Sequence, residues 1–192
     1  MAKSYTDASK KERLRTIRWV VTVFFTTLVV SGLIGLVSDE VMASSSLPVA
    51  FGILLFIVLL GIVFDIVGMA VASADEKPFH SMAARKVPGA QEAIRLLRNA
   101  ERVSSICNDV VGDICGVVSG SASATIAALI LTQVDVGWPR GVSLVMSALV
   151  AGLTVGGKAI GKTFAVNSCT QIVHMVGRVL HALNGLHGKK KK

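Results

Sequence analysis

Charged residues inside apolar segments are the first feature of this sequence that could support chemistry. Lys158 and Lys162 lie in the last long apolar run, while Asp65, Asp109 and Asp113 lie in earlier ones. The two lysines are four residues apart, so they share one face of a helix. A lysine inside a bilayer costs roughly 2.5–3.5 kcal/mol on insertion scales unless it finds a partner, water or the interface. The three carboxylates are therefore the candidate partners of these lysines.

The apolar runs are long enough to cross a bilayer. Hydrophobic residues make up 52% of the 192-residue chain, and its mean hydropathy is +0.65. That composition is too apolar for an ordinary soluble domain, and a spanning helix needs about 20 apolar residues. Four segments meet this requirement, at 19–37, 48–74, 103–131 and 141–166. We therefore predict an all-α membrane protein with four transmembrane helices, the first of them a retained signal anchor.

The charges in the loops predict how the chain is oriented. Basic residues dominate the N-terminal segment 1–18, the connection between the second and third spans, and the C-terminal region. In the loop 38–47, by contrast, the charged residues are all acidic. The positive-inside rule then places both ends in the cytoplasm, and we expect a multi-pass protein of the plasma (inner) membrane. The net charge of +8, including the basic tail 187–192, suits an anionic leaflet, so we expect no nucleic-acid partner.

Two segments outside the spans have helical amphipathic patterns. They lie at about 79–101, interrupted by Pro88-Gly89, and at 167–186, and we expect both to be juxtamembrane helices on the cytoplasmic side. A soluble connector is the alternative for the first. The apolar faces consist of Ala90, Ala93, Ile94 and Leu97 in the first segment and of Ile172, Val173, Val176, Val179, Leu180 and Leu183 in the second. We expect His174 and His181 to lie on the solvated face opposite.

Counting residues from the outer ends of the spans gives each charge a depth. Asp65 follows Pro48 by 17 residues and Lys158 follows Gly141 by 17, so both lie about 26 Å from the outer boundary. Asp109 falls in the same layer, Asp113 one turn deeper, and Lys162 near the interface, where it can snorkel. We predict a polar cluster where the second, third and fourth spans meet, formed by Asp65, Asn108, Asp109, Asp113 and Lys158.

The third span is longer than a bilayer requires. At 1.5 Å per residue, 103–131 measures about 43 Å against a hydrocarbon core of roughly 30 Å. Either its first turns lie in the interface or the helix bends near its Gly/Ser cluster. Small residues favour close helix contact, and we expect a homodimer through spans three and four. The glycines assigned to helix packing are Gly61, Gly68, Gly112, Gly116, Gly120, Gly157 and Gly161.

Three stretches of this sequence resemble the transmembrane domain of the CNNM/CorC family of magnesium transporters. They are Phe64-Asp65 near the end of the second span, Leu96-Leu97-Arg98-Asn99-Ala100-Glu101-Arg102 followed by Ser104-Ser105-Ile106, and Gly157-Lys158-Ala159-Ile160-Gly161-Lys162. The family motif at the second stretch has proline where this chain has Ala100. The resemblance covers about residues 55–183, with 19–37 as an added first helix, and 48–186 forms the CNNM-like domain.

The resemblance implies a dimer with a magnesium site between the spans. The family's ligand positions fall on or near Asp65 and loosely on Asn108, while its glutamate position falls on Lys158. Because an ammonium group cannot coordinate a metal, we expect a degenerate or modified divalent-cation site in which Lys158 acts as a tethered cation. The family's nucleotide-binding CBS module is absent from this sequence, so an unidentified cytoplasmic protein could take its regulatory place.

Two other functions fit the same sequence. One is a structural or partner-binding membrane protein that does not transport. The other is a proton-coupled carrier in which Asp113 titrates in a low-dielectric layer. The sequence shows no phosphate-binding loop, nucleophile–base pair or metal-hydrolase motif, so we do not expect an enzyme. Cys107, Cys115 and Cys169 lack the spacing of a zinc site or disulfide framework.

Overall fold

Helices account for all regular structure in the part of the chain described by the computed structural model, residues 2–134 and 137–188. The basic tail expected at 187–192 lies mostly outside these residues. The elements are α1 (Ala2–Ala43), α2 (Leu47–Ser73), α3 (Lys77–Ala84), α4 (Ala90–Arg98), α5 (Ala100–Ser105), the π-helix η1 (Ile106–Gly112), α6 (Asp113–Gln133), α7 (Pro139–Asn167) and α8 (Cys169–Gly188). The predicted all-α fold is confirmed.

Within the described residues, four helical stretches are long and apolar enough to cross a membrane. They are Ile17–Met42, Leu47–Ser73, Ala100–Gln133 and Pro139–Asn167, so the chain has the architecture of a multi-pass membrane protein. A proline stands in the first turn of both α2 and α7, where its missing N–H costs nothing. The first span runs further than expected, because α1 continues to Ala43 through the segment predicted as a loop. Met42 is fully buried there, and its packing keeps that turn helical.

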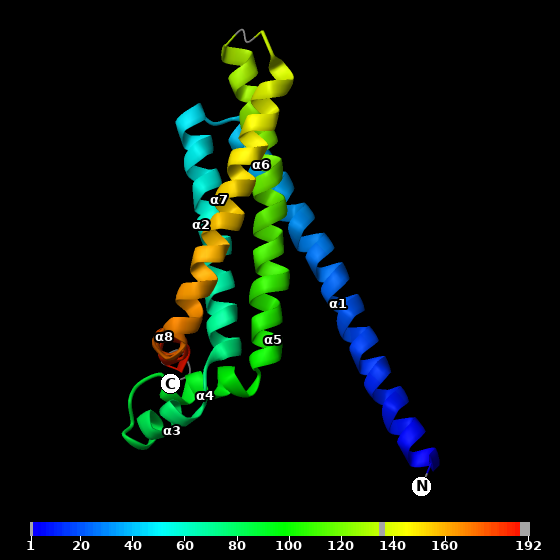
Figure 1. Ribbon diagram of the computed structural model, residues 1–192, viewed down its shortest axis with the longest axis vertical. Helices are drawn as coiled ribbons and strands as arrows, with labels where there is room; N and C mark the ends of the chain where they lie inside the picture. Colours follow the sequence, from blue (N-terminus) through cyan, green and yellow to red (C-terminus); the bar gives the residue numbers. More distant parts are fainter. Residues whose placement is uncertain (1, 135–136, 189–192) are drawn as a thin grey trace.

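The spanning helices form a bundle with its accessory helices at one end. In Figure 1, α2, α6 and α7 lie side by side. α1 begins apart from the bundle and crosses α6 before the turn to α2, while α3, α4 and α8 gather at the same end of the molecule as the start of α1. Two apolar cores hold the bundle together. One joins α2, α6 and α7 around Leu54, Ile126 and Met146, and the other joins α2 to the accessory helices around Phe79 and Val173.

The first juxtamembrane segment differs from its predicted outline. The interruption expected at Pro88-Gly89 is present, and the segment forms α3 and α4, joined by a turn in which Lys86 and Gly89 have positive φ angles of 56° and 85°. The helix from Ala90 ends at Arg98 rather than Glu101, because the backbone leaves helical geometry at Asn99. Residues from Ala100 onward begin the third span.

The second juxtamembrane helix, α8, buries a narrower face than expected. Ile172 and Val173 are buried, whereas Val179 and Leu183 are each 54% exposed. The reason is the crossing with α4, where Gly177 lies directly against Gly89 and the two backbones approach closely. The buried stripe therefore follows this crossing rather than the whole apolar pattern.

Candidate functional site

Asp65 is the buried carboxylate of the spanning region. It lies on the face of α2 that packs against η1 and α7, and it is 4% exposed. Along α2 it falls between Val58, in one apolar core, and Ala70, in the other. A carboxylate in such surroundings is costly unless a charged partner or hydrogen-bond donors compensate it. The partners of Asp65 therefore define the site.

Two lysines of α7 reach this carboxylate. Lys158 Nζ lies 3.6 Å from Asp65 Oδ1, and Lys162 Nζ lies 3.9 Å from Asp65 Oδ2. The Lys158 side chain is 21% exposed, and that of Lys162 is 50% exposed. The first lysine is thus the inner partner and the second reaches in from the surface. One carboxylate facing two ammonium groups leaves a net charge of about +1.

Glycines make room for this contact. A Cβ atom added to Gly112 would lie 3.3 Å from Lys158 Nζ and 3.7 Å from Asp65 Oδ1, so the backbone of Gly112 forms one wall of the ion pair. Gly157 and Gly161 on α7 lie against Ile62 and Ile66 on α2. Because these contacts bring α7 close to α2, the lysine that follows each glycine can reach Asp65.

Asn108 occupies the next turn of the same face. Its side chain lies against Gly68 of α2, and its Nδ2 donates to Ser104 Oγ at 3.3 Å. Asn108 Oδ1 and Asp65 Oδ2 are buried atoms with no hydrogen-bond partner among the described residues. Buried acceptors are normally satisfied. The site therefore has acceptor capacity left for a donor or a cation.

Asp109 and Asp113 lie outside this site. Both are exposed, and among the described residues neither forms a salt bridge with a lysine or arginine. Asp109 accepts a hydrogen bond from Ser105 Oγ at 2.6 Å. Each aspartate directly follows an inward-facing residue, Asn108 or Gly112, and successive helical residues are about 100° apart around the axis. Of the five residues of the predicted cluster, the structure brings Asp65 and Lys158 together, with Asn108 beside them.

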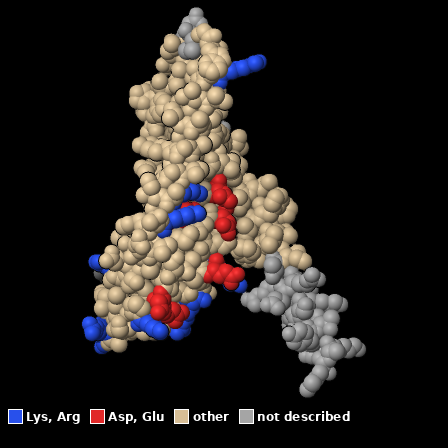
Figure 2. All heavy atoms as spheres, viewed as in Figure 1, with Lys and Arg blue, Asp and Glu red and all other residues tan. Residues whose placement is uncertain are grey.

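We call Asp65, Asn108, Lys158 and Lys162 the Asp65 cluster. Lys162 was expected at the interface, yet it is the second partner of Asp65, and its four-residue spacing from Lys158 was the signal for this role. In the space-filling view, blue and red atoms lie next to one another midway down the molecule, above the charged atoms that gather at its lower end (Figure 2). Among the described residues, no three His, Cys, Asp or Glu side chains gather as a metal site.

The π-helix η1 is a feature that no sequence signal specified. The excess length of the third span predicted either interfacial first turns or a bend near the Gly/Ser cluster, but the irregularity lies earlier, at Ile106–Gly112. A π-turn accommodates one extra residue, and such turns are frequent at functional sites. Here it adjoins the Asp65 cluster and sets which side chains of the third span face α2.

The glycines assigned to packing behave in two ways. Gly61 lies against Cys115, so it belongs with the close contacts already described at Gly68, Gly112, Gly157 and Gly161. Gly116 and Gly120 are different, because a Cβ atom added to either would meet nothing within 4 Å. Within the described chain these two glycines therefore pack against no other helix.

A hydrogen-bonded pair at the accessory end was not predicted from the sequence. His181 Nδ1 on α8 lies 3.0 Å from Glu92 Oε1 on α4, and the hydrogen bond from this imidazole lowers the pKa of the Glu92 carboxyl. Residue spacing gives no signal for a contact between helices this far apart in the chain. His174, expected on the solvated face, is partly buried, with Nε2 lacking a hydrogen-bond partner among the described residues.

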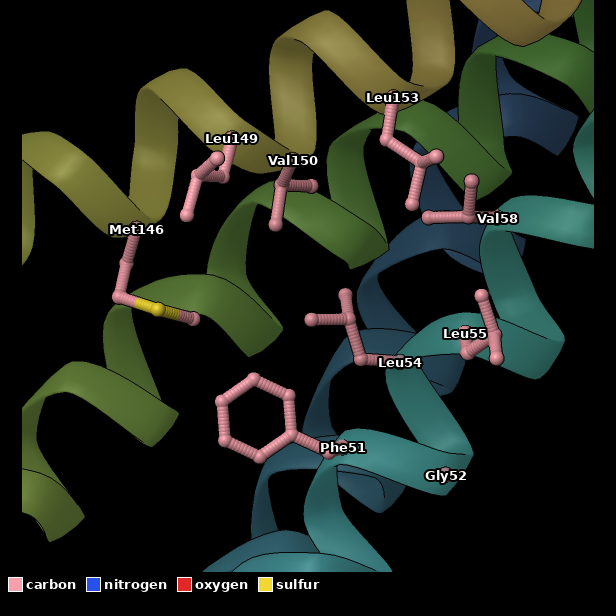
Figure 3. A pocket seen from close by; sticks show the side chains of 9 residues that line it. All are labelled: Phe51, Gly52, Leu54, Leu55, Val58, Met146, Leu149, Val150 and Leu153. Atoms are coloured by element: carbon pink, nitrogen blue, oxygen red, sulfur yellow. The ribbon is translucent and has the colours of Figure 1, made fainter.

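A separate apolar pocket of about 340 Å³ lies between α2 and α7. In Figure 3, Phe51 and Leu54 of α2 face Met146 and Val150 of α7 across it. Its nine lining residues carry no ionisable or hydroxyl group. This pocket suits hydrocarbon and offers no reactive group, so the chemistry of the spanning region is concentrated in the Asp65 cluster.

The chain was compared with known proteins at three levels. None of the protein-family models, curated proteins or solved structures compared with it matches. The function is therefore inferred from the Asp65 cluster itself.

Proposed function

We propose that this protein is a multi-pass membrane protein with a modified divalent-cation site, in which the Lys158 ammonium group takes the place of a bound cation. The supporting observation is the 3.6 Å contact between Lys158 Nζ and Asp65 Oδ1 at a buried position in the spanning region. An ammonium group attracts a carboxylate as a metal ion does. It has no lone pair with which to coordinate a metal, and its charge repels an incoming cation.

Two buried oxygen atoms on the α2–η1 face support the proposal. Magnesium prefers oxygen ligands such as carboxylates and amide carbonyls. Asp65 Oδ2 and Asn108 Oδ1 are both buried and lack hydrogen-bond partners among the described residues. Removing the lysine charge and supplying another carboxylate from the same position would provide acidic and amide oxygens together. The resemblance to CNNM/CorC transporters supports the same assignment, because Lys158 falls on the family's glutamate position.

The test is magnesium binding by Lys158→Glu. We expect the parent protein to show no magnesium-dependent rise in melting temperature in detergent and the variant to show one. A ligand at 100 times its dissociation constant stabilises a folded protein by about 2.7 kcal/mol. Lys162→Glu is the matched control, because it makes the same charge change at the half-exposed lysine. If Lys158→Glu binds magnesium no better than the parent, the modified-site proposal is wrong.

A second candidate is a structural or partner-binding protein of the same fold that does not transport. The observation in its favour is that both lysines contact one carboxylate across the α2–α7 interface, which is how ion pairs hold helices together. Proteoliposomes containing the Lys158→Glu variant distinguish the two candidates. Magnesium flux above that of vesicles with the parent protein would favour the modified cation site, whereas equal flux from both proteins would favour the structural role.

We propose a homodimer through the face of η1 and α6 that carries Asp109, Asp113, Gly116 and Gly120. This face is largely exposed, and its two glycines leave space for a close helix contact. In a protein lacking its three native cysteines, Gly120→Cys should form a disulfide-linked dimer in native membranes. Leu153→Cys, at an exposed position of α7, should not. Equal cross-linking at both positions would argue against this interface.

A further inference from the structure

The register of the π-helix decides which polar side chain of the third span faces α2. Asn108 lies against Gly68, whereas Asp109, the next residue, is exposed and bound to Ser105. Asparagine and aspartate have almost the same shape but differ by one charge. The space against Gly68 that holds one of these side chains therefore fits the other, and the helical register selects between them.

A change from π-helix to α-helix would put Asp109 in the place of Asn108. The π-turn contains one more residue than the corresponding stretch of α-helix. Suppose that η1 became α-helical while α6 stayed in place. Each residue on the N-terminal side of the extra residue would then shift by one position, into the place of the residue that precedes it in the chain. Asp109 would then take the place of Asn108 against Gly68. Cys107 would move to the place of Ile106.

The charges of the Asp65 cluster favour such an exchange. Asp65 is the buried carboxylate for two lysines, and the more distant of them, Lys162, is 3.9 Å away. Gly112 and Lys158 are neighbours, so they mark one level of the bundle. Asn108 lies one turn from Gly112, and Lys162 lies one turn from Lys158 toward the same end. Asn108 and Lys162 therefore occupy the next level together. A carboxylate at the Asn108 position would give Lys162 a partner of its own.

The helix before η1 is built so that it can turn. None of the residues of α5 is fully buried. Ala100 and Val103 are partly buried against the core around Phe79 and Val173, so rotation of α5 would cost only these partial contacts. The backbone already leaves helical geometry at Asn99, which separates α5 from α4. On the other side of η1, α6 is anchored by buried residues such as Ile114, Cys115 and Val118. Rotation therefore falls on the segment between Asn99 and η1.

We propose that the third span exchanges between the observed π-register and an α-register in which Asp109 replaces Asn108 against Gly68. The exchange switches the Asp65 cluster from a net charge of about +1 to about zero. The inference concerns regulation of the site in the proposed function. It rests on the charge arrangement and not on magnesium binding, so its test is independent of the magnesium test.

The native thiol of Cys107 reports the register. This residue is 8% exposed in the observed register, whereas the position to which it would move, that of Ile106, is 50% exposed. The experiment measures the rate at which N-ethylmaleimide modifies Cys107 in the full-length protein carrying Cys115→Ala and Cys169→Ala. A parallel protein that keeps Cys115 and lacks Cys107 and Cys169 reports general loosening of the bundle.

Changes of charge should move the equilibrium in opposite directions. Asp65→Asn leaves both lysines without a carboxylate, so we expect Cys107 to react at least tenfold faster, with Cys115 unchanged. Lys162→Met removes the charge that attracts the second carboxylate, and the reaction should slow. Adding Asp109→Asn to Asp65→Asn should return the rate toward that of the parent. An Asp65→Asn variant that reacts no faster, or in which Cys115 reacts faster to the same extent, would overturn the proposal.

Deleting Val110 should fix the third span in a single register. The deletion removes the extra residue of the π-turn and leaves Asn108 in its present position on a continuous α-helix. Cys107 should then stay protected, and Asp65→Asn should no longer accelerate its modification. Acceleration that persists in a folded deletion variant would contradict the register mechanism. If the deletion variant fails to fold, the comparison of Asp65→Asn with and without Asp109→Asn still decides the question.

Discussion

At the scale of single residues, the central fact is an imbalance of charge at Asp65. Its carboxylate is 4% exposed and has two lysines within 4 Å. A buried ion pair is not in itself strong evidence of stabilisation, because desolvation offsets the attraction between the charges. Removing one member is different, since it leaves an uncompensated charge behind. Because of this imbalance, removing the aspartate and removing one lysine should have different effects on stability.

This asymmetry predicts unequal effects of two substitutions. Asp65→Asn leaves two lysines without a carboxylate and should lower the free energy of unfolding by about 3–5 kcal/mol. Lys158→Met should cost less, because Lys162 remains 3.9 Å from the carboxylate. The measurement is unfolding of the detergent-solubilised protein with each single variant and the double variant. Equal losses from both single substitutions would show that Lys162 does not compensate.

At the scale of elements, the site depends on how closely η1 approaches α2. Gly68 has no side chain, and the space that a Cβ would fill is occupied by Asn108 and Cys107 of η1. Cys107 contributes its Cβ atom to this contact, and a Cβ cannot move without its backbone. The position of η1, and with it the wall of the ion pair at Gly112, therefore requires glycine at residue 68.

Replacing this glycine should displace the π-helix. We expect Gly68→Ala to destabilise the protein by about 1–3 kcal/mol, the usual cost of overpacking a tight contact. Gly52→Ala in the same helix is the matched control, because nothing lies within 4 Å of a Cβ added there. The control should be neutral or up to about 1 kcal/mol more stable, since alanine is the better helix former. Thermal melting of both variants measures the difference, and equal melting temperatures would count against a tight α2–η1 contact.

At the scale of the whole molecule, a charged layer separates two apolar cores. Asp65 lies between the core around Leu54 and Ile126 and the core around Phe79 and Val173. The end of the bundle with α3, α4 and α8 is rich in basic residues, while Arg140 marks the other end. α1 begins and α8 ends on the same side of the bundle (Figure 1). From the four spans and the positive-inside rule we propose that this side faces the cytoplasm.

This topology predicts the labelling of single cysteines in the cysteine-free protein. Cysteines introduced at Ser45 and Gly137, in the two loops opposite the accessory helices, should react with a membrane-impermeant maleimide added to intact cells. A cysteine at Lys86, between α3 and α4, should react only after the membrane is permeabilised. Labelling of Lys86→Cys in intact cells would reverse the orientation. Labelling of only one of the two loops would require a different number of spans.

Much of the architecture could be predicted because it depends on local sequence. Runs of apolar residues fix the spans, and the four predicted segments lie within the observed helices almost to their ends. Depth along a helix also follows from counting, which is why Asp65 and Lys158 were correctly placed at one level. The loop predicted at 38–47 is confined to 44–46, because packing of Met42 extends α1, a tertiary effect that local polarity does not reveal.

The sequence by itself determined that this chain is helical, that four helices can span a bilayer, and that opposite charges occur at a common depth. Only the tertiary structure decided which of those charges meet. Depth depends on the rise per residue, which is uniform, whereas direction around the axis depends on the packing of neighbours and on the extra residue of η1. That residue and the glycine contacts turn Asn108 and Gly112 inward, leave Asp109 and Asp113 exposed, and give Asp65 two lysine partners.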